Sequence, residues 1–253
     1  MSWIRRESSD DSSGGRRRID KRRSEIESRA LFYRDEQERV QKKTFTNWIN
    51  TYLIQCQPPC KIADLFPEVK DGIKLLLLLE VLSGQKLPHE SRKVMQRVHC
   101  LSNVRTALSF LESKKIKLVN INPADIVDGK PSIVLGLIWT IILYFQIEEQ
   151  EDTIMKSLEG TELAERGEKF KGSAKKALLA WAQNNLGDKY AIDIRDFGNS
   201  WRDGSAFNAM VHNIDPSLVD MEKLGDRTNR ENLEAAFAAA ESGLNIPRLI
   251  DPE

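Results

Sequence analysis

The sequence predicts an all-α protein built from two similar helical domains, and three observations support this. Apolar side chains recur at helical spacing in several segments, and no run alternates apolar and polar residues as a half-buried strand would. Blocks of the first half also reappear, in order, in the second half. The length of 253 residues suits two domains of about 100 to 150 residues each.

The composition argues against several classes of protein. The chain carries 38 Lys plus Arg and 38 Asp plus Glu, so no net charge draws it to nucleic acid. Three cysteines, Cys56, Cys60 and Cys100, are too few for a disulfide scaffold. The N-terminus has no apolar segment of the kind found in secretory signals. We therefore expect reduced thiols in a cytosolic protein.

Residues 1–34 form a basic segment that we expect to be a disordered tail. It contains RRRIDKRR (residues 16–23), with six basic side chains and one acidic one, and it has few apolar residues. A solvated tail is the simplest interpretation of the run, while a nuclear-import signal or a phosphoinositide-binding patch stays open. A charged helix is expected to begin near Glu25.

The next helical segment should pack one side into a core. Four apolar residues follow the spacing i, i+3, i+4, i+8, which places them on one helical face: Phe45, Trp48, Ile49 and Leu53. The segment QPP at residues 57–59 should end this helix, because proline lacks an amide N–H and clashes with the preceding turn.

Further helices follow from spacing and end signals. The segment KDGIKLLLLLEVLSG predicts a helix that begins near Asp71 and ends before Gly84. The segment NVRTALSFLESKKI places four apolar side chains on one stripe: Val104, Ala107, Leu108 and Leu111. Asn122 as cap and Pro123 as first residue predict another helical turn.

The most apolar stretch, IVLGLIWTIILYFQI at residues 133–147, could be a membrane span or a core helix. Its 15 residues fall short of the roughly 20 that a spanning helix needs, and they include Thr140 and Gln146. We therefore expect no transmembrane segment here. A helix that is apolar on all sides belongs inside a large core, and Pro131 should open it.

An internal duplication organises the chain. Matched blocks run in the same order: Trp48 with Trp181, Asp71–Gly72 with Asp203–Gly204, Asn103 with Asn232, and Ile121–Pro123 with Ile250–Pro252. Their offsets of 133, 132, 129 and 129 residues drift slowly, as small gaps in a duplicated domain would cause. Four ordered matches seldom arise by chance, so we predict two copies of one domain.

These residues carry a family resemblance. The segment QKKTFTNWIN resembles the first signature of actinin-type actin-binding domains, which are tandems of calponin-homology (CH) domains. The segment LVNINPADIVDGKPSIVLGLIWTIILYF is similar to the second signature, and LLEVLSGQKLP and NRENLEAAF resemble the nesprin branch, with calmin as a near neighbour. We expect a first CH domain at residues 35–148, a linker at 149–171 and a second CH domain at 172–253.

The resemblance implies F-actin binding without catalysis. It implies that the first domain provides most of the affinity and that the second tunes it by closing against the first. It also implies a cytoplasmic location on the actin cytoskeleton, and the nuclear envelope for a nesprin-like parent protein. The family's actin-contacting segments carry over to residues 41–50, 66–78 and 125–144.

Only the polar side of these segments can meet a partner, because spacing places Trp48, Leu75 and Leu79 in the core. The candidate actin-binding residues are Gln41, Lys42, Lys43, Asn50, Lys70, Lys74, Lys130 and Trp139. The resemblance implies an acidic actin surface, so these lysines would steer encounter in a salt-sensitive way. Each lysine taken singly could equally be a solvated charge, and Trp139 could be a core residue.

The residue pattern gives no basis for an enzyme. The side chains available for a metal or nucleophilic site are Cys56, Cys60, Cys100, His89, His99 and His212. Their spacing is poor for zinc, and no Gly-rich phosphate loop is present. We expect no catalytic residue, no metal and no cofactor. Binding of anionic phosphoinositide lipids through the basic tail is the alternative function.

The second repeat ends differently from the first. By the offset of 129, Pro252 corresponds to Pro123, so residues 125–147 have no counterpart in these 253 residues. We therefore expect the second domain to lack its final apolar helix here and the parent polypeptide to continue with one. Without that helix, the faces near Trp181, Phe207 and Phe237 should be uncovered, and the domain should be molten or prone to aggregate.

Overall fold

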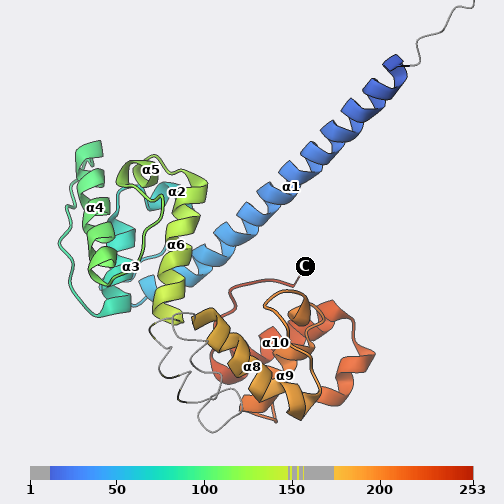
Figure 1. The fold of residues 1–253 in the computed structure, drawn as a ribbon. Helices are drawn as coiled ribbons and strands as arrows, with labels where there is room; N and C mark the ends of the chain where they lie inside the picture. The colour runs from blue at the N-terminus through green and yellow to red at the C-terminus, as the bar shows by residue number, and fades with distance from the viewer. Residues whose placement is uncertain (1–11, 148, 150–152, 154–155, 157–173, 253) are drawn as a thin grey trace, which may run out of the picture. The chain divides into compact units, whose positions relative to one another are not determined.

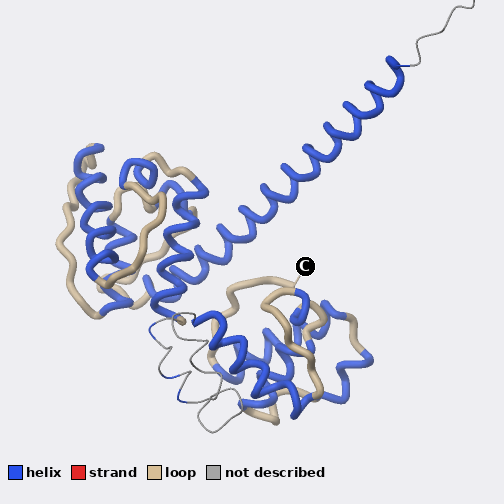
Figure 2. The backbone as a smooth tube through the Cα atoms, in the orientation of Figure 1, coloured by secondary structure: helices blue, strands red, loops and turns tan. Residues whose placement is uncertain are grey.

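The computed structural model describes residues 12–147, 149, 153, 156 and 174–252. Every regular element in these ranges is a helix (Figure 2), which confirms the all-α prediction. The chain divides into two compact units, residues 1–42 and 43–253. Figure 1 gives the order of the helices along the chain. The linker expected at residues 149–171 lies almost wholly outside the described residues.

Helix α1 runs from Ser12 to Leu53. It begins well before Glu25, so the prediction of disorder is wrong for residues 12–34, which are helical. The physical reason is that a shortage of apolar residues argues against a core but not against a helix, and Arg, Lys and Glu have high helix propensity. Within the first unit, large apolar side chains of α1 are exposed: Ile26, Leu31, Phe32 and Tyr33.

The first domain continues with α2 (Leu65–Glu68), α3 (Ile73–Ser83), α4 (Arg97–Ser113), α5 (Pro123–Val127) and α6 (Pro131–Gln146). The predicted end signals are in place. Gly84 ends α3 in the left-handed conformation, with φ of 68°. The Asn122 side-chain oxygen caps α5 by accepting a hydrogen bond from the Asp125 amide at 3.0 Å.

Large aliphatic and aromatic side chains build the core of the first domain. Trp48, Leu75 and Leu79 are buried as predicted, together with the predicted apolar face of α1. Helix α6 adds a buried face of its own: Val134, Leu135, Leu137, Ile138, Ile141 and Phe145. The apolar stretch is therefore a core helix. In the part of the chain that the structure describes, no helix is long and apolar enough to cross a membrane.

The second domain consists of α8 (Ala174–Tyr190), a short 3-10 helix η3 (Asn199–Trp201), α9 (Ser205–Ile214), a second 3-10 helix η4 (Met221–Asp226) and α10 (Asn229–Leu244). Thr228 and Glu231 form a reciprocal capping box at the start of α10. The buried cluster of this domain is rich in small side chains: Ala182, Leu186, Ile194, Ala206 and Ala209.

An apolar groove of 370 Å³ opens on the second domain. Phe207 of α9 and Phe237 of α10 line it, as do Met210, Ile214 and Leu244. Both phenylalanines are half-buried, whereas Trp181 packs against the buried cluster of the domain. Phe207 and Phe237 thus line an open groove, and no helix follows α10 in the described residues up to Pro252.

Candidate functional site

The candidate residues near the end of α1 have different environments. In the first unit, Gln41 is exposed and Lys42 is half-buried. In the second unit, Lys43 is exposed and its ammonium group forms an ion pair with the carboxylate of Asp251. This pair holds the pKa of Asp251 below its ordinary value, chiefly through the hydrogen bond from Lys43.

Asn50 has a structural role within the first domain. Its Nδ2 donates a hydrogen bond to the Ile62 carbonyl at 2.9 Å, and its Oδ1 accepts one from the Ile62 amide at 2.8 Å. These two bonds fasten the segment after α1 back onto the helix. Both polar atoms of the side chain are therefore engaged within the fold, which makes Asn50 a weak candidate for partner contact.

Lys70 and Lys130 come together with a third cation around Asp128. Arg97, the first residue of α4, pairs with Asp128, and Lys130 pairs with Asp125 of α5. The hydrogen bond from Arg97, with the charges of Arg97, Lys130 and Lys70, holds the pKa of Asp128 below its ordinary value. We call Lys70, Arg97, Asp125, Asp128 and Lys130 the Asp128 cluster. It carries three positive and two negative charges.

A glycine allows this arrangement. Gly129 connects α5 to α6 with φ of +71°, a conformation that other residues rarely adopt. The aliphatic part of the Lys70 side chain lies where a Cβ on Gly129 would stand. A side chain at residue 129 would therefore displace Lys70 from the turn that carries Lys130.

Lys74 belongs to a different environment. It is half-buried on α3, and its charge acts on the thiol of Cys56 rather than on Asp128. The structure therefore brings Lys70 and Lys130 together within one cluster and leaves Lys74 outside it.

Trp139 is exposed to 47%, so the alternative that it is a core residue is wrong. Its ring stacks on Phe45 of α1, with centroids 6.3 Å apart and planes 13° from parallel. Because α6 is apolar on all sides, its sequence pattern could not show which position faces outward. The result is a large aromatic ring held in place on one side and open on the other.

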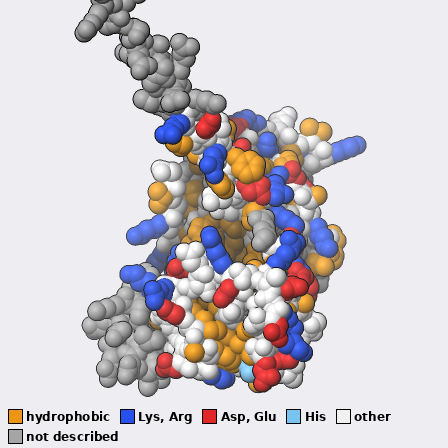
Figure 3. Space-filling view, turned by 90° about the vertical axis from the view of Figure 1, so that its right-hand side faces the viewer, with side chains coloured by type: hydrophobic (Ala, Val, Ile, Leu, Met, Phe, Trp, Pro, Cys, Tyr) orange, Lys and Arg blue, Asp and Glu red, His pale blue; other side chains and the backbone are white. Residues whose placement is uncertain are grey.

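Arg97 is the member of the site that sequence reasoning missed. It pairs with a carboxylate 31 residues away, and no local pattern signals such a contact. Figure 3 shows basic and acidic side chains interleaved over the face it presents, in keeping with the balanced charge of the chain. Charge therefore gathers in small clusters such as the one at Asp128.

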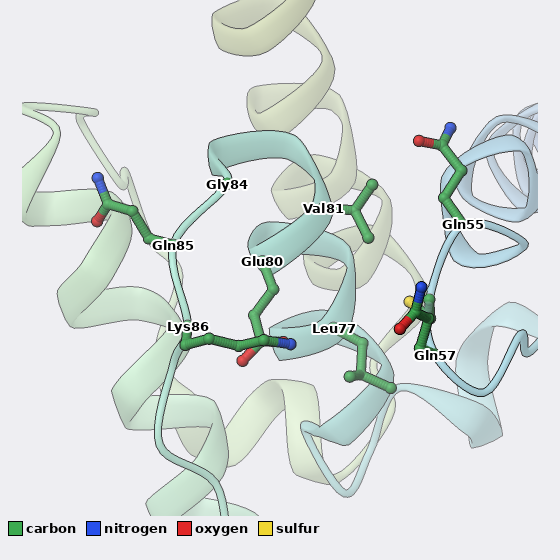
Figure 4. Close-up of a pocket in the computed structure, with 9 residues that line it drawn as sticks. Gln55, Gln57, Leu77, Glu80, Val81, Gly84, Gln85 and Lys86 are labelled. Atoms are coloured by element: carbon green, nitrogen blue, oxygen red, sulfur yellow. The ribbon is translucent and has the colours of Figure 1, made fainter.

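The pocket in Figure 4 offers little to a substrate. It has a volume of 230 Å³ and lies between the loop after α1 and the end of α3. Two of the residues that line it, Glu80 and Lys86, pair with each other, with 2.9 Å between the carboxylate and the ammonium. Across the described ranges, no group of three or more His, Cys, Asp or Glu side chains could hold a metal ion.

The family model for the calponin homology (CH) domain matches residues 39–147 and 172–253, so the chain belongs to the CH-domain family, with two copies in tandem. It is 51% identical over 244 residues to Muscle-specific protein 300 kDa of Drosophila melanogaster, covering 91% of this chain and 2% of that protein. It is 46% identical over 240 residues to human Calmin, covering 86% of this chain and 24% of that protein.

Mouse Nesprin-2 is 44% identical over 239 residues, covering 86% of this chain and 3% of that protein. The chain thus spans only a small part of these relatives. Among solved structures, the actin-crosslinking core of Schizosaccharomyces pombe fimbrin superposes with a TM-score of 0.62 at 23% identity, covering 85% of this chain and 44% of that one. This likeness supports the tandem all-α fold.

Proposed function

We propose that the chain binds F-actin through its first CH domain and that the second domain regulates this binding. The observation that carries the proposal is the Asp128 cluster, a net positive group on the first domain of a tandem CH protein. The exposed ring of Trp139 supplies an apolar contact on the same domain. Support also comes from the fimbrin fragment, whose name states that it crosslinks actin.

The two features suit different parts of a binding reaction. Exposed lysines raise the rate of encounter with an acidic surface, and this effect weakens as salt screens it. A half-exposed tryptophan whose ring is already fixed by Phe45 loses little side-chain freedom when a partner covers it. We therefore assign steering to the lysines and much of the contact energy to Trp139.

Co-sedimentation with F-actin tests the proposal. The whole chain should pellet with filaments at low salt, and less of it should pellet as salt rises. The double variant Lys70→Glu/Lys130→Glu should weaken binding by about tenfold or more, because it replaces attraction with repulsion. Lys117→Glu is the matched control, since Lys117 is exposed and lies outside the Asp128 cluster.

Charge reversal beside Asp125 and Asp128 could also disturb the fold. Circular dichroism and thermal unfolding of each variant address this, and Lys70→Gln/Lys130→Gln provides a milder change. A folded protein that does not pellet at low salt would overturn the proposal. Unchanged binding by both folded double variants, with wild-type pelleting intact, would instead show that the cluster is the wrong face.

The regulatory part of the proposal rests on the Lys43–Asp251 ion pair. Lys43 is a candidate contact for actin, and Asp251 belongs to the second CH domain, so pairing competes with binding. Asp251→Lys should release Lys43 and tighten binding, whereas Lys43→Glu should weaken it. Equal affinity of wild type and Asp251→Lys would argue against this competition.

As a finer proposal, a nesprin-like parent protein would use the module to tether the nuclear envelope to actin.

A membrane-surface role is the second candidate. The observation that favours it is the exposure of Ile26, Leu31, Phe32 and Tyr33 on the helix that also carries the basic run at residues 16–23. Basic residues beside exposed apolar ones suit an anionic bilayer surface. The chain should float with vesicles that contain phosphatidylinositol bisphosphate, and the Phe32→Ser/Tyr33→Ser variant should not. Pelleting of this variant with F-actin should stay unchanged.

A further inference from the structure

Two of the three cysteines meet directly after α1. The amides of Cys56 and Cys60 both donate to the carbonyl oxygen of Leu53, with N···O distances of 3.2 and 3.1 Å. The two amide nitrogens therefore lie no farther apart than the sum of these distances. Such proximity is compatible with a disulfide, whose Cα atoms usually lie about 4.4–6.8 Å apart.

The side chains also lie near each other. Both cysteines are free thiols, and Cys60 is close enough to act on the pKa of Cys56. Burial and the neighbouring Cys60 raise the pKa of the Cys56 thiol, which keeps Cys56 protonated at neutral pH. The backbone and side-chain geometry thus bring two reducing groups together in one loop of the first domain.

The two sulfurs differ in accessibility. Cys56 is exposed to only 8% and forms part of the wall of the 230 Å³ pocket in Figure 4. Cys60 is half-buried and packs at the edge of the first-domain core. A reagent from solution therefore reaches Cys60 first, and Cys56 stands ready as the second thiol.

We propose that Cys56 and Cys60 form a reversible intramolecular disulfide by exchange with a small-molecule disulfide of the glutathione type. The Cys60 thiolate attacks the reagent disulfide, forms a mixed disulfide and releases one small thiolate. The Cys56 thiol then gives up its proton, and its thiolate attacks the Cys60 sulfur of the mixed disulfide and expels the second small thiolate. The protons of both cysteines end on the two released small thiols. The protein loses two electrons and the reagent gains them.

The fold holds this loop ready for the bond. Two hydrogen bonds between Asn50 and Ile62 fix the far end of the loop, and the shared Leu53 carbonyl fixes the near end. Closing the bond in the folded protein therefore costs less chain entropy than closing it in an unfolded chain. Folding should favour the disulfide, and the disulfide should in turn favour folding.

The test compares the exchange equilibrium with glutathione in the folded chain and in denaturant. The protein is equilibrated, quenched with acid, alkylated and cleaved after its lysines. Mass spectrometry then measures the peptide of residues 44–61, which follows Lys43, ends at Lys61 and contains both cysteines. We expect that peptide to lose two hydrogens and both alkylation sites. The equilibrium constant should be at least about tenfold higher when folded, which corresponds to about 1.4 kcal/mol.

Variants separate the possible outcomes. Cys100→Ser should retain the reaction, whereas Cys56→Ser and Cys60→Ser should each abolish the internal bond, with Cys56→Ser leaving a stable glutathione adduct on Cys60. An equal or lower equilibrium constant in the folded chain would overturn the proposal. So would a stable adduct on wild-type Cys60 without loss of two hydrogens, or a bond between Cys100 and either partner.

Discussion

The two repeats share one turn almost atom for atom. In the first, Gly72 has φ of 76°, Asp71 Oδ1 accepts from the Ile73 amide at 2.9 Å, and the Gly72 carbonyl accepts from the Leu76 amide at 3.0 Å. The second has the same set: Gly204 at φ of 80°, Asp203 Oδ1 with the Ser205 amide at 3.0 Å, and the Gly204 carbonyl with the Asn208 amide at 3.0 Å.

A buried asparagine packs against each glycine, yet the two asparagines differ. Asn103 is fully engaged: its Oδ1 accepts from the Glu90 amide at 2.7 Å, and its Nδ2 donates to the carbonyls of Asp71 and Glu90 at 2.9 Å. Asn232 donates to the Leu224 carbonyl at 3.2 Å, and its Oδ1 accepts no hydrogen bond from the described residues.

The neighbouring core position differs as well. Leu76 is fully buried in the first repeat, and Asn208 is fully buried at the matching position of the second. Asn208 donates to the carbonyls of Gly204 and Asn232 at 2.8 Å, but its Oδ1 also lacks a donor among the described residues. Turn geometry is therefore shared, while core composition has diverged. The close approach of glycine and asparagine, rather than apolar volume, is what the repeats have in common.

Exchanging the matching core residues, Leu76 and Asn208, should give the largest loss of stability and the greatest difference between the two domains. Leu76→Asn should destabilise the first domain by about 4 kcal/mol, because it removes buried apolar surface and buries an unpaired amide. Asn208→Leu should change the second domain by no more than about 1.5 kcal/mol, since it removes two hydrogen bonds and one unpaired oxygen together. Hydrogen exchange read peptide by peptide resolves the two domains. Similar losses in both would contradict the proposed divergence.

Alanine at the shared glycines should destabilise both repeats to a similar extent. A Cβ on Gly72 would stand 2.7 Å from the Asn103 Cβ and 2.9 Å from the Val104 nitrogen, and Gly204 has equivalent contacts with Asn232 and Leu233. Strain from positive φ adds about 1–2 kcal/mol, so we expect a loss of about 3 kcal/mol in each domain.

Gly84→Ala is the matched control for these glycine variants. Gly84 has φ of 68°, but a Cβ there would meet nothing within 4 Å. It should therefore show the backbone strain alone, about 1 kcal/mol. If Gly84→Ala and Gly72→Ala cost the same when measured by denaturant unfolding, the packing against Asn103 is not a determinant of the turn.

Replacing the two buried asparagines with alanine should also destabilise the two repeats unequally, and the difference should be smaller than for the exchange of the core residues. Asn103→Ala leaves the Glu90 amide without its acceptor and should cost about 2–3 kcal/mol. Asn232→Ala removes one longer hydrogen bond and one unpaired oxygen, and should cost about 1 kcal/mol. Thermal unfolding with domain-resolved hydrogen exchange checks both values. An equal cost would mean that the unpaired oxygen of Asn232 carries no penalty.

Much of the fold could be predicted from local signals. The spacing of Phe45, Trp48, Ile49 and Leu53 gave a buried face, and Gly84 marked the end of α3, because these features depend on neighbours within a turn or two of helix. The start of α1 was predicted too late. Composition reports whether a segment can form a core, and this segment is helical although its apolar side chains are exposed.

The candidate site was harder to predict, for physical reasons. The family resemblance points to Lys70 and Lys130, but only the tertiary structure brings Arg97 into an ion pair with Asp128, whose carboxylate both lysines influence. Asn50 was chosen in the same way, and its bonds to Ile62 depend on a loop that returns to the helix. Helical spacing cannot identify the exposed side of α6, because that helix is apolar all round.

The smallest expected effect concerns Glu80, whose counterpart at the offset of 132 in the second repeat is His212. Burial raises the pKa of Glu80, but hydrogen bonds from the Leu87 amide at 2.7 Å and the Lys86 ammonium at 2.9 Å outweigh it, and the pKa lies below its ordinary 4.5. The ionised carboxylate joins the end of α3 to the segment that follows it, which contains Lys86 and Leu87. This contact lies at the edge of the pocket in Figure 4.

A carboxyl group whose pKa is lowered by folding stabilises the folded state above its unfolded pKa, and the contribution is lost as pH falls through the folded value. Glu80→Gln should therefore lower the melting temperature of the first domain slightly at pH 7, and the difference from wild type should shrink steadily once the pH falls below about 4.5. Melting curves at a series of pH values measure this, with exposed Glu112→Gln as control. A difference that stays constant down to pH 3 would show that Glu80 acts through its shape and hydrogen bonds alone, and that its charge does not help to hold the first repeat at this turn.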